Sequence, residues 1–160
     1  MGISVSIAEL VPLMKEIFKL GKTFTLTAKG SSMVPLLHDS RDEIILADCV
    51  DPSKLKVRDI PLYLRDDGSY VLHRIVRVNK DSFDMCGDAQ TEIERGVPKG
   101  NVVAIAVGFV RKGKAISVKS KRYRIFGFLW CLARPIRPVL FWLNSKLRGK
   151  RNEKPQKQQP

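Results

Sequence analysis

The feature that most constrains the fold is a series of short segments rich in Val, Ile, Leu and Tyr. They cover residues 23–28, 42–47, 60–65, 70–78, 82–86, 102–111 and 114–118. Turn sequences such as Asp66-Asp67-Gly68-Ser69 and Lys112-Gly113 lie between them, and such turns close antiparallel hairpins. Short strands joined by tight turns are typical of a coiled antiparallel sheet or barrel. We therefore expect residues 23–118 to form one mainly β domain.

The N-terminal segment has the pattern of an amphipathic helix. Ser6 and Glu9 stand at the spacing of a capping box, and Gly21 can end the helix. Apolar residues recur between them at intervals of three and four, namely Ile7, Leu10, Val11, Met14, Ile17 and Phe18. Charged residues interrupt this segment, so it resembles neither a secretory signal nor a membrane span. We expect residues 1–22 to form an N-terminal amphipathic helix.

The net charge of +13 is concentrated near the C-terminus. Residues 1–118 contain 17 basic and 15 acidic side chains, whereas residues 119–160 contain 12 basic side chains and Glu153 as the single acid. Apolar residues in this segment recur at intervals of three and four, as in Ile125, Leu129, Leu132, Ile136, Val139, Leu143 and Leu147. The pattern predicts a basic amphipathic helical tail over residues 119–151, followed by a disordered tail over residues 152–160.

Aromatic and cationic residues in this tail favour contact with an anionic membrane surface, through Trp130, Arg134, Arg137 and Trp142. The alternative is a helix packed on the barrel or on a partner. If the segment is an anchor, its removal should leave the barrel folded. Its uncharged runs are too short to cross a bilayer, so we expect a cytoplasmic or peripheral membrane protein. We expect no nucleic-acid partner, because no helix-turn-helix pattern accompanies the charge.

The cysteine content argues against a disulfide scaffold and a zinc site. Cys49, Cys86 and Cys131 are odd in number, lack metal-ligand spacing and have two histidines to assist them. A reducing compartment fits this pattern. We expect no metal and no organic cofactor.

Three short motifs supply a serine, a histidine and an aspartate in this order. They are Gly30-Ser31-Ser32-Met33-Val34-Pro35, Val71-Leu72-His73-Arg74 and Gly87-Asp88. A serine hydroxyl becomes a nucleophile when a base removes its proton, and an imidazole base needs a third group to fix its tautomer. The motifs therefore offer the parts of a serine hydrolase. An ordinary imidazole pKa of about 6.5 would keep His73 largely neutral near pH 7.

Together the motifs resemble the signature boxes of the type I signal peptidase and SOS-repressor peptidase superfamily, over roughly residues 23–118. Its common bacterial members use a lysine base, whereas endoplasmic-reticulum-type signal peptidases have histidine, and this chain resembles that Ser-His branch. The resemblance implies a barrel of the signal peptidase type, with Ser32 as nucleophile, His73 as general base and Asp88 as its support. It also implies oxyanion or substrate-binding roles for the neighbouring residues Gly30, Ser31, Met33 and Pro35. Relatives often carry a serine at the position of Gly30, whose hydroxyl helps form the oxyanion hole.

Each site residue also has a structural interpretation. Ser32 can open a turn after a strand, His73 can be a satisfied histidine on an apolar strand face, and Asp88 can cap its own turn. His38 is expected on a solvated turn beside Asp39.

The resemblance implies a serine endopeptidase that cleaves an extended leader or precursor peptide, bound as an added strand with small residues near the cut. A cytoplasmic processor of one dedicated peptide is a second enzymatic interpretation. The alternative is a non-catalytic barrel of the same superfamily that binds a peptide or a membrane surface.

Overall fold

The first helix begins at the predicted capping box. The computed structural model describes residues 6–137 and 139, and its helix α1 spans Ile7–Lys19. The Ser6 hydroxyl accepts a hydrogen bond from the Glu9 N–H, and the Glu9 carboxylate accepts one from the Ser6 N–H. Apolar side chains spaced three and four apart are buried beneath the helix, namely Val11, Met14 and Phe18. The predicted amphipathic helix is therefore present in residues 7–19.

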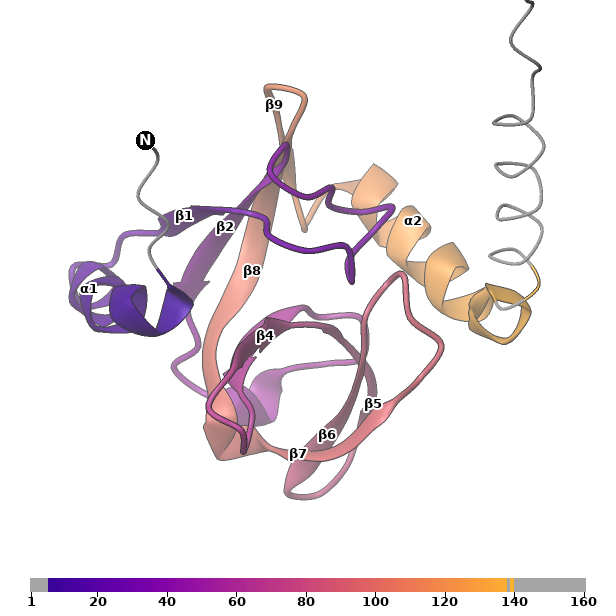
Figure 1. Cartoon of the computed structure of the whole chain (residues 1–160), viewed down its shortest axis with the longest axis horizontal. Coiled ribbons are helices and arrows are strands. Elements are labelled where there is room, and N and C mark those ends of the chain that lie inside the picture. The colour runs from indigo at the N-terminus through magenta and orange to yellow at the C-terminus, as the bar shows by residue number, and fades with distance from the viewer. Residues whose placement is uncertain (1–5, 138, 140–160) are drawn as a thin grey trace, which may run out of the picture.

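The strands form a mainly β structure with a curled antiparallel half-barrel (Figure 1). One sheet contains β1 (Phe24–Thr27), β2 (Glu43–Asp48), β8 (Val102–Arg111), β3 (Pro61–Leu64) and β4 (Tyr70–Leu72) in this order, with β9 (Lys114–Ser117) paired to β8. The other contains β5 (Arg74–Val78), β6 (Ser82–Cys86) and β7 (Glu94–Pro98). The 3-10 turns η1 (Pro52–Lys54) and η2 (Lys99–Asn101) lie in the connections. The long strand β8 is the central strand of this sheet, because it pairs with β2 on one side, with β3 on the other and with β9 near its C-terminal end.

The chain passes from one sheet to the other at His73. The sequence predicts one strand over residues 70–78, whereas the structure divides it into β4 and β5. Beyond the break, Ile75 exchanges backbone hydrogen bonds with Arg58 and Asp59 rather than with β3. His73 therefore lies at the junction of the two sheets.

Two apolar clusters form the core. The larger cluster contains side chains from α1, from strands β2 and β8, and from the loop that follows β1. It includes Met14, Leu37, Leu46 and Phe109. The smaller lies inside the second sheet and consists of Tyr63, Ile75, Phe83, Met85 and Val97. The residues on either side of His73 belong to different clusters: Leu72 of β4 packs against the larger cluster, and Ile75 of β5 belongs to the smaller one.

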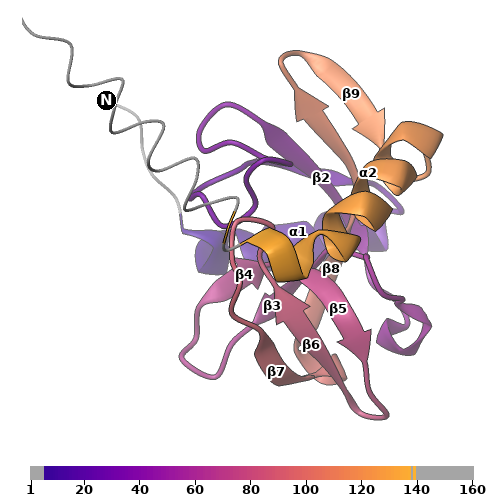
Figure 2. The same ribbon diagram turned by 90° about the vertical axis from the view of Figure 1, so that its right-hand side faces the viewer.

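The second helix, α2 (Lys121–Leu132), packs on the β domain and is followed by the 3-10 turn η3 (Arg134–Ile136). Tyr123 enters the larger core cluster, with its ring centroid 5.4 Å from that of Phe109. Helices α1 and α2 lie on opposite sides of the molecule (Figures 1 and 2). No helix within the described residues is long and apolar enough to cross a bilayer.

The predicted membrane-surface residues divide between the interior and the surface. Arg137 is buried, and its guanidinium donates to the carbonyls of Trp130, Gly87 and Gln90 at 2.7, 3.5 and 3.4 Å. The Trp130 indole N–H donates to the Asp88 carbonyl at 3.1 Å, and Arg134 is half-buried. The surface prediction is therefore wrong for Arg137, because this side of the helix faces the β domain. Trp142 and residues 152–160 lie outside the described residues.

Candidate active site

A groove on the α1 side of the molecule contains both Ser32 and His73. Its volume is about 750 Å³. Its walls come from helix α1, from strands β1 and β4, and from the loop that follows β1. Most of the lining is apolar: Ile7, Leu10, Leu26, Met33, Leu37, Ile44, Leu46, Leu62, Val71 and Leu72. Arg65 and Gln90 add polar side chains. The groove therefore places the predicted nucleophile and base against an apolar surface.

The loop after β1 presents Ser32. Gly30 adopts a left-handed φ of +82°, which favours glycine, and its N–H donates to Asp39 at 2.8 Å. Met33 anchors the loop from the other side because its side chain is buried in the core. Ser32 is half-buried. Within residues 6–137 and 139, neither its hydroxyl nor its N–H has a hydrogen-bond partner in the protein.

A hydrogen-bond chain determines the tautomer of His73. The Tyr63 hydroxyl donates to Glu94 Oε2 at 2.6 Å, and its oxygen lies 3.2 Å from His73 Nδ1. Because the single Tyr63 proton is directed to a carboxylate that only accepts, the Tyr63 oxygen must accept from His73. His73 Nδ1 therefore carries the imidazole proton. The other nitrogen, Nε2, is left with a lone pair that can accept a proton.

Burial and charge keep this imidazole neutral. Burial lowers the pKa of His73, and the nearby Arg65 cation adds to this effect, while the Glu94 and Asp88 carboxylates oppose it; the resulting pKa is about 4. Glu94 is itself held as a carboxylate: although burial opposes ionisation, hydrogen bonds from Arg65 and Tyr63 keep its pKa below the usual value. The arrangement supplies a neutral His73 oriented through an ionised Glu94.

Asp88 has a different partner from the one predicted. Its two carboxylate oxygens bind Arg74 at 2.8 and 2.6 Å, and both side chains are 1% exposed. No hydrogen bond joins Asp88 to His73 in the described part of the chain. The orienting position beside His73 Nδ1 belongs to Tyr63 and Glu94 instead.

The remaining predicted residues lie at different depths around Ser32. Gly30 and Met33 line the groove, whereas Ser31 is exposed, and neither Ser31 nor Pro35 belongs to its lining. The structure adds Gln90, which sequence reasoning missed. Its loop contacts that of Ser32, because the Ala89 N–H donates to the Ser32 carbonyl at 2.8 Å.

The sequence held a partial signal for the residues around His73. Alternation along the predicted strand 60–65 places Tyr63 and Arg65 on the same face, opposite Leu62 and Leu64. Glu94 gave no such signal, because it belongs to β7, a strand that the sequence analysis did not predict.

In the described residues, no group of His, Cys, Asp and Glu side chains could hold a metal ion. Comparison of the chain with protein-family models, curated proteins and solved structures gives no match in any of the three.

Proposed function

We propose that this protein is a serine endopeptidase resembling signal peptidases, which cleaves an extended leader or precursor peptide. One observation carries the proposal: Ser32 and His73 line the same groove, and the Tyr63–Glu94 pair gives His73 the tautomer of a general base. An anionic or hydrogen-bonded group that fixes the imidazole tautomer is the third element of such a site. Here Glu94, acting through Tyr63, fills that role.

In the proposed reaction, Ser32 Oγ attacks the scissile carbonyl while His73 Nε2 takes its proton. His73 then gives this proton to the leaving amine, and an acyl-enzyme ester on Ser32 remains. Water attacks the ester, His73 again takes and returns a proton, and the new carboxyl end leaves. No metal or organic cofactor enters these steps.

The oxyanion would be stabilised by the Ser32 N–H, which has no acceptor among the described residues. Gly30 offers no side-chain donor. Gln90 lines the same groove and could act as a substitute donor, because its Oε1 accepts from the Gly87 N–H at 3.3 Å and its NH₂ group remains available. We assign Gln90 to the oxyanion or to the adjacent substrate amide.

The groove is suited to an extended, mainly apolar segment. Most of its lining is apolar, and a smaller number of polar side chains, Ser32 and His73 among them, could orient a peptide bond on this surface. Helix α1 closes one side through Ile7 and Leu10. Small apolar residues next to the cut would fit between these walls.

A fluorophosphonate probe tests the proposal without a known substrate. Attack by Ser32 would form a P–O bond and expel fluoride, and intact-mass and peptide mass spectrometry would locate the adduct. We expect labelling of Ser32 and cleavage within an extended peptide library. Ser32→Ala should abolish both, and His73→Gln should reduce cleavage by roughly 10⁴-fold, since such residues act as a unit.

Ser31→Ala is the matched control, because Ser31 is the adjacent serine but is exposed and lies outside the groove lining. It should retain labelling and cleavage. Loss of activity in Ser31→Ala with retention in Ser32→Ala would overturn the assignment of the nucleophile.

A non-catalytic peptide-binding barrel is the second candidate. Two observations favour it: no hydrogen bond joins Ser32 to His73 among the described residues, and a pKa of about 4 makes His73 a weak base. This candidate predicts that library peptides bind in the groove and are recovered uncut, with Ser32 unlabelled.

A further inference from the structure

The outward face of α2 and η3 is apolar although it faces solvent. Its side chains recur along the helix at intervals of three and four: Ile125, Phe128, Leu129, Leu132, Ile136 and Val139. Phe128 is 54% exposed and Leu132 is 66% exposed. The opposite face carries Tyr123, Gly127 and Arg137, which are buried against the β domain. Several large apolar side chains exposed along one helix face are typical of an interaction site.

Cations surround the N-terminal half of this apolar face. Lys121 and Arg124 come from the first turns of α2, and Arg58 comes from the neighbouring loop, with its guanidinium 5.7 Å from the Phe128 ring centroid. These residues border a shallow cavity of about 340 Å³ together with Ile125 and Leu129. Cations near the N-terminus of a helix lower its stability. Helix stability therefore does not account for their position.

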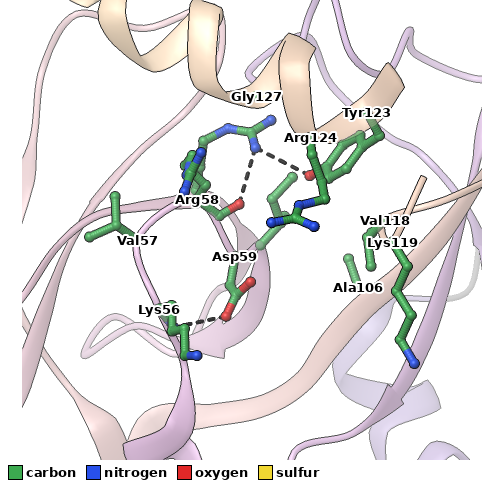
Figure 3. A pocket seen from close by; sticks show the side chains of 12 residues that line it. Lys56, Val57, Arg58, Asp59, Ala106, Val118, Lys119, Tyr123, Arg124 and Gly127 are labelled. Carbon is green, nitrogen blue, oxygen red and sulfur yellow. Dashed lines mark hydrogen bonds between the residues drawn. The ribbon is translucent and has the colours of Figure 1, made fainter. Parts of the chain in front are cut away.

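A second cavity continues the basic surface beneath the helix. Its volume is about 510 Å³, and Arg58 and Arg124 line both cavities. Lys56, Lys119 and the buried Arg74, which is paired with Asp88, are further cations of its lining, and Asp59 is its single acidic residue. Figure 3 shows Tyr123 and Arg124 extending from α2 toward the segment that carries Arg58 and Asp59. An anionic group that entered the cavity between α2 and the segment of residues 56–60 would therefore lie close to several cationic side chains.

We infer that the outward face of α2 and η3 docks on an anionic lipid surface. The apolar side chains would enter the acyl boundary, while Arg58, Lys121 and Arg124 would lie at the level of the lipid phosphates. Charge decides between this occupant and a second copy of the chain. Two copies meeting through this face would bring their cationic rims together in a protein with net charge +13. A lipid surface supplies the opposite charge.

This contact uses the opposite side of the helix from Trp130 and Arg137. No residue of α2 or η3 lines the groove that contains Ser32 and His73, so the lipid contact and the groove use different residues. The inference is independent of the proposed peptidase activity, since it concerns only binding.

Co-sedimentation of the full chain with vesicles tests the inference. The vesicles contain phosphatidylcholine alone or a mixture with phosphatidylglycerol, at about 0.05 and about 0.5 M NaCl. We expect binding to the anionic vesicles that weakens at high salt, because the Debye length shortens to a few ångströms. Lys121→Gln with Arg124→Gln should lower the partition coefficient about 25-fold, or fivefold per cation. Phe128→Ser with Leu132→Ser should lower it at least tenfold at either salt concentration.

Leu13→Ser with Leu20→Ser is the matched control, because these leucines are 52% and 70% exposed at α1, on the other side. It should bind like the wild type, and circular dichroism should show that all variants are folded. Equal loss in both apolar double variants would overturn the inference. So would a monomer–dimer equilibrium that Phe128→Ser abolishes in a protein that does not bind vesicles, or displacement by inorganic phosphate at constant ionic strength.

Discussion

The Ser32 carbonyl accepts a hydrogen bond of 2.8 Å from the Ala89 N–H. Gly87 packs against the same carbonyl so closely that a Cβ at this position would lie 2.7 Å from the Ser32 oxygen. The loop carrying Gly87 and Ala89 therefore packs against the backbone of the Ser32 loop. Because these contacts involve backbone atoms, a change of side-chain rotamer cannot relieve a clash there.

Gly87→Ala should displace the Ser32 loop. We expect a loss of roughly 1 to 3 kcal/mol in the free energy of unfolding, as for an overpacked site, and slower fluorophosphonate labelling of Ser32. Urea unfolding and mass spectrometry measure the two effects. Gly100→Ala is the control, because its Cβ would meet nothing within 4 Å. Equal effects of the two substitutions would contradict this account of the loop.

The buried pair of Asp88 and Arg74 should matter for stability. Asp88→Asn removes the countercharge of a guanidinium that is 1% exposed, and we expect a loss of about 3 to 5 kcal/mol in urea unfolding. Arg74→Met combined with Asp88→Leu should recover part of this loss, because no buried charge remains. Glu16→Gln, which breaks an exposed ion pair with Lys19, should change stability by less than about 1 kcal/mol.

The two histidines should have opposite neutral tautomers. His73 Nδ1 donates to Tyr63, whereas His38 Nδ1 lies 2.8 Å from Arg41, which can only donate. Imidazole nitrogen and carbon chemical shifts near pH 7.5 should therefore show the Nδ1–H form for His73 and the Nε2–H form for His38. Tyr63→Phe should release His73 from this form and leave His38 unchanged. An Nε2–H signal for wild-type His73 would contradict the proposed base.

Acidification should destabilise the native state through His73. Its folded-state pKa of about 4 lies below the value of 6.5 expected of the unfolded chain. Between these values the unfolded chain binds a proton that the native protein does not, so stability rises with pH and is complete above about 6.5. The effect is on the order of 3 kcal/mol.

Urea unfolding between about pH 4 and pH 7.5 measures this slope, and His73→Asn should flatten it relative to the wild type. The acidic limb of any peptidase activity should likewise lie near pH 4, below the ordinary imidazole range expected from the sequence. An acidic limb near pH 6.5 would show that burial does not lower the pKa of His73.

Removal of residues 119–160 should unfold or aggregate the β domain. Tyr123 would leave the core, and the Asp88 carbonyl would lose its bond from Trp130. Circular dichroism and size-exclusion chromatography measure the outcome. A folded, monomeric product would contradict this expectation and would support the sequence-based prediction that the segment is an anchor whose removal leaves the barrel folded.

Local patterns explain what the sequence could predict. The capping box of Ser6 and Glu9 lies within one helical turn, and most strands follow from runs of apolar and β-branched residues between turns. The β7 segment Glu94–Pro98 lacks such a run and contains both glycine and proline, so it was missed. Glu94 was missed with it.

Long-range pairing explains what the sequence could not predict. His73 and Arg74 are adjacent, yet His73 turns toward Tyr63 and Arg74 toward Asp88, because neighbouring residues at the sheet junction face different surroundings. The outward apolar face of α2 shows the same limit. Its periodicity is visible in Ile125, Leu129 and Leu132, but the sequence does not determine which face packs on the barrel.

The hydrogen bonds of Trp130 and Arg137 to the loop of residues 87–90 have a temporal consequence. These donors lie 42 to 50 positions after the carbonyls that they bind. Since the chain is synthesised from its N-terminus, Ser32 and His73 leave the ribosome well before the residues that secure the loop beneath Ser32. The groove would therefore reach its final geometry only late in synthesis, and a nascent chain would carry Ser32 and His73 without this support.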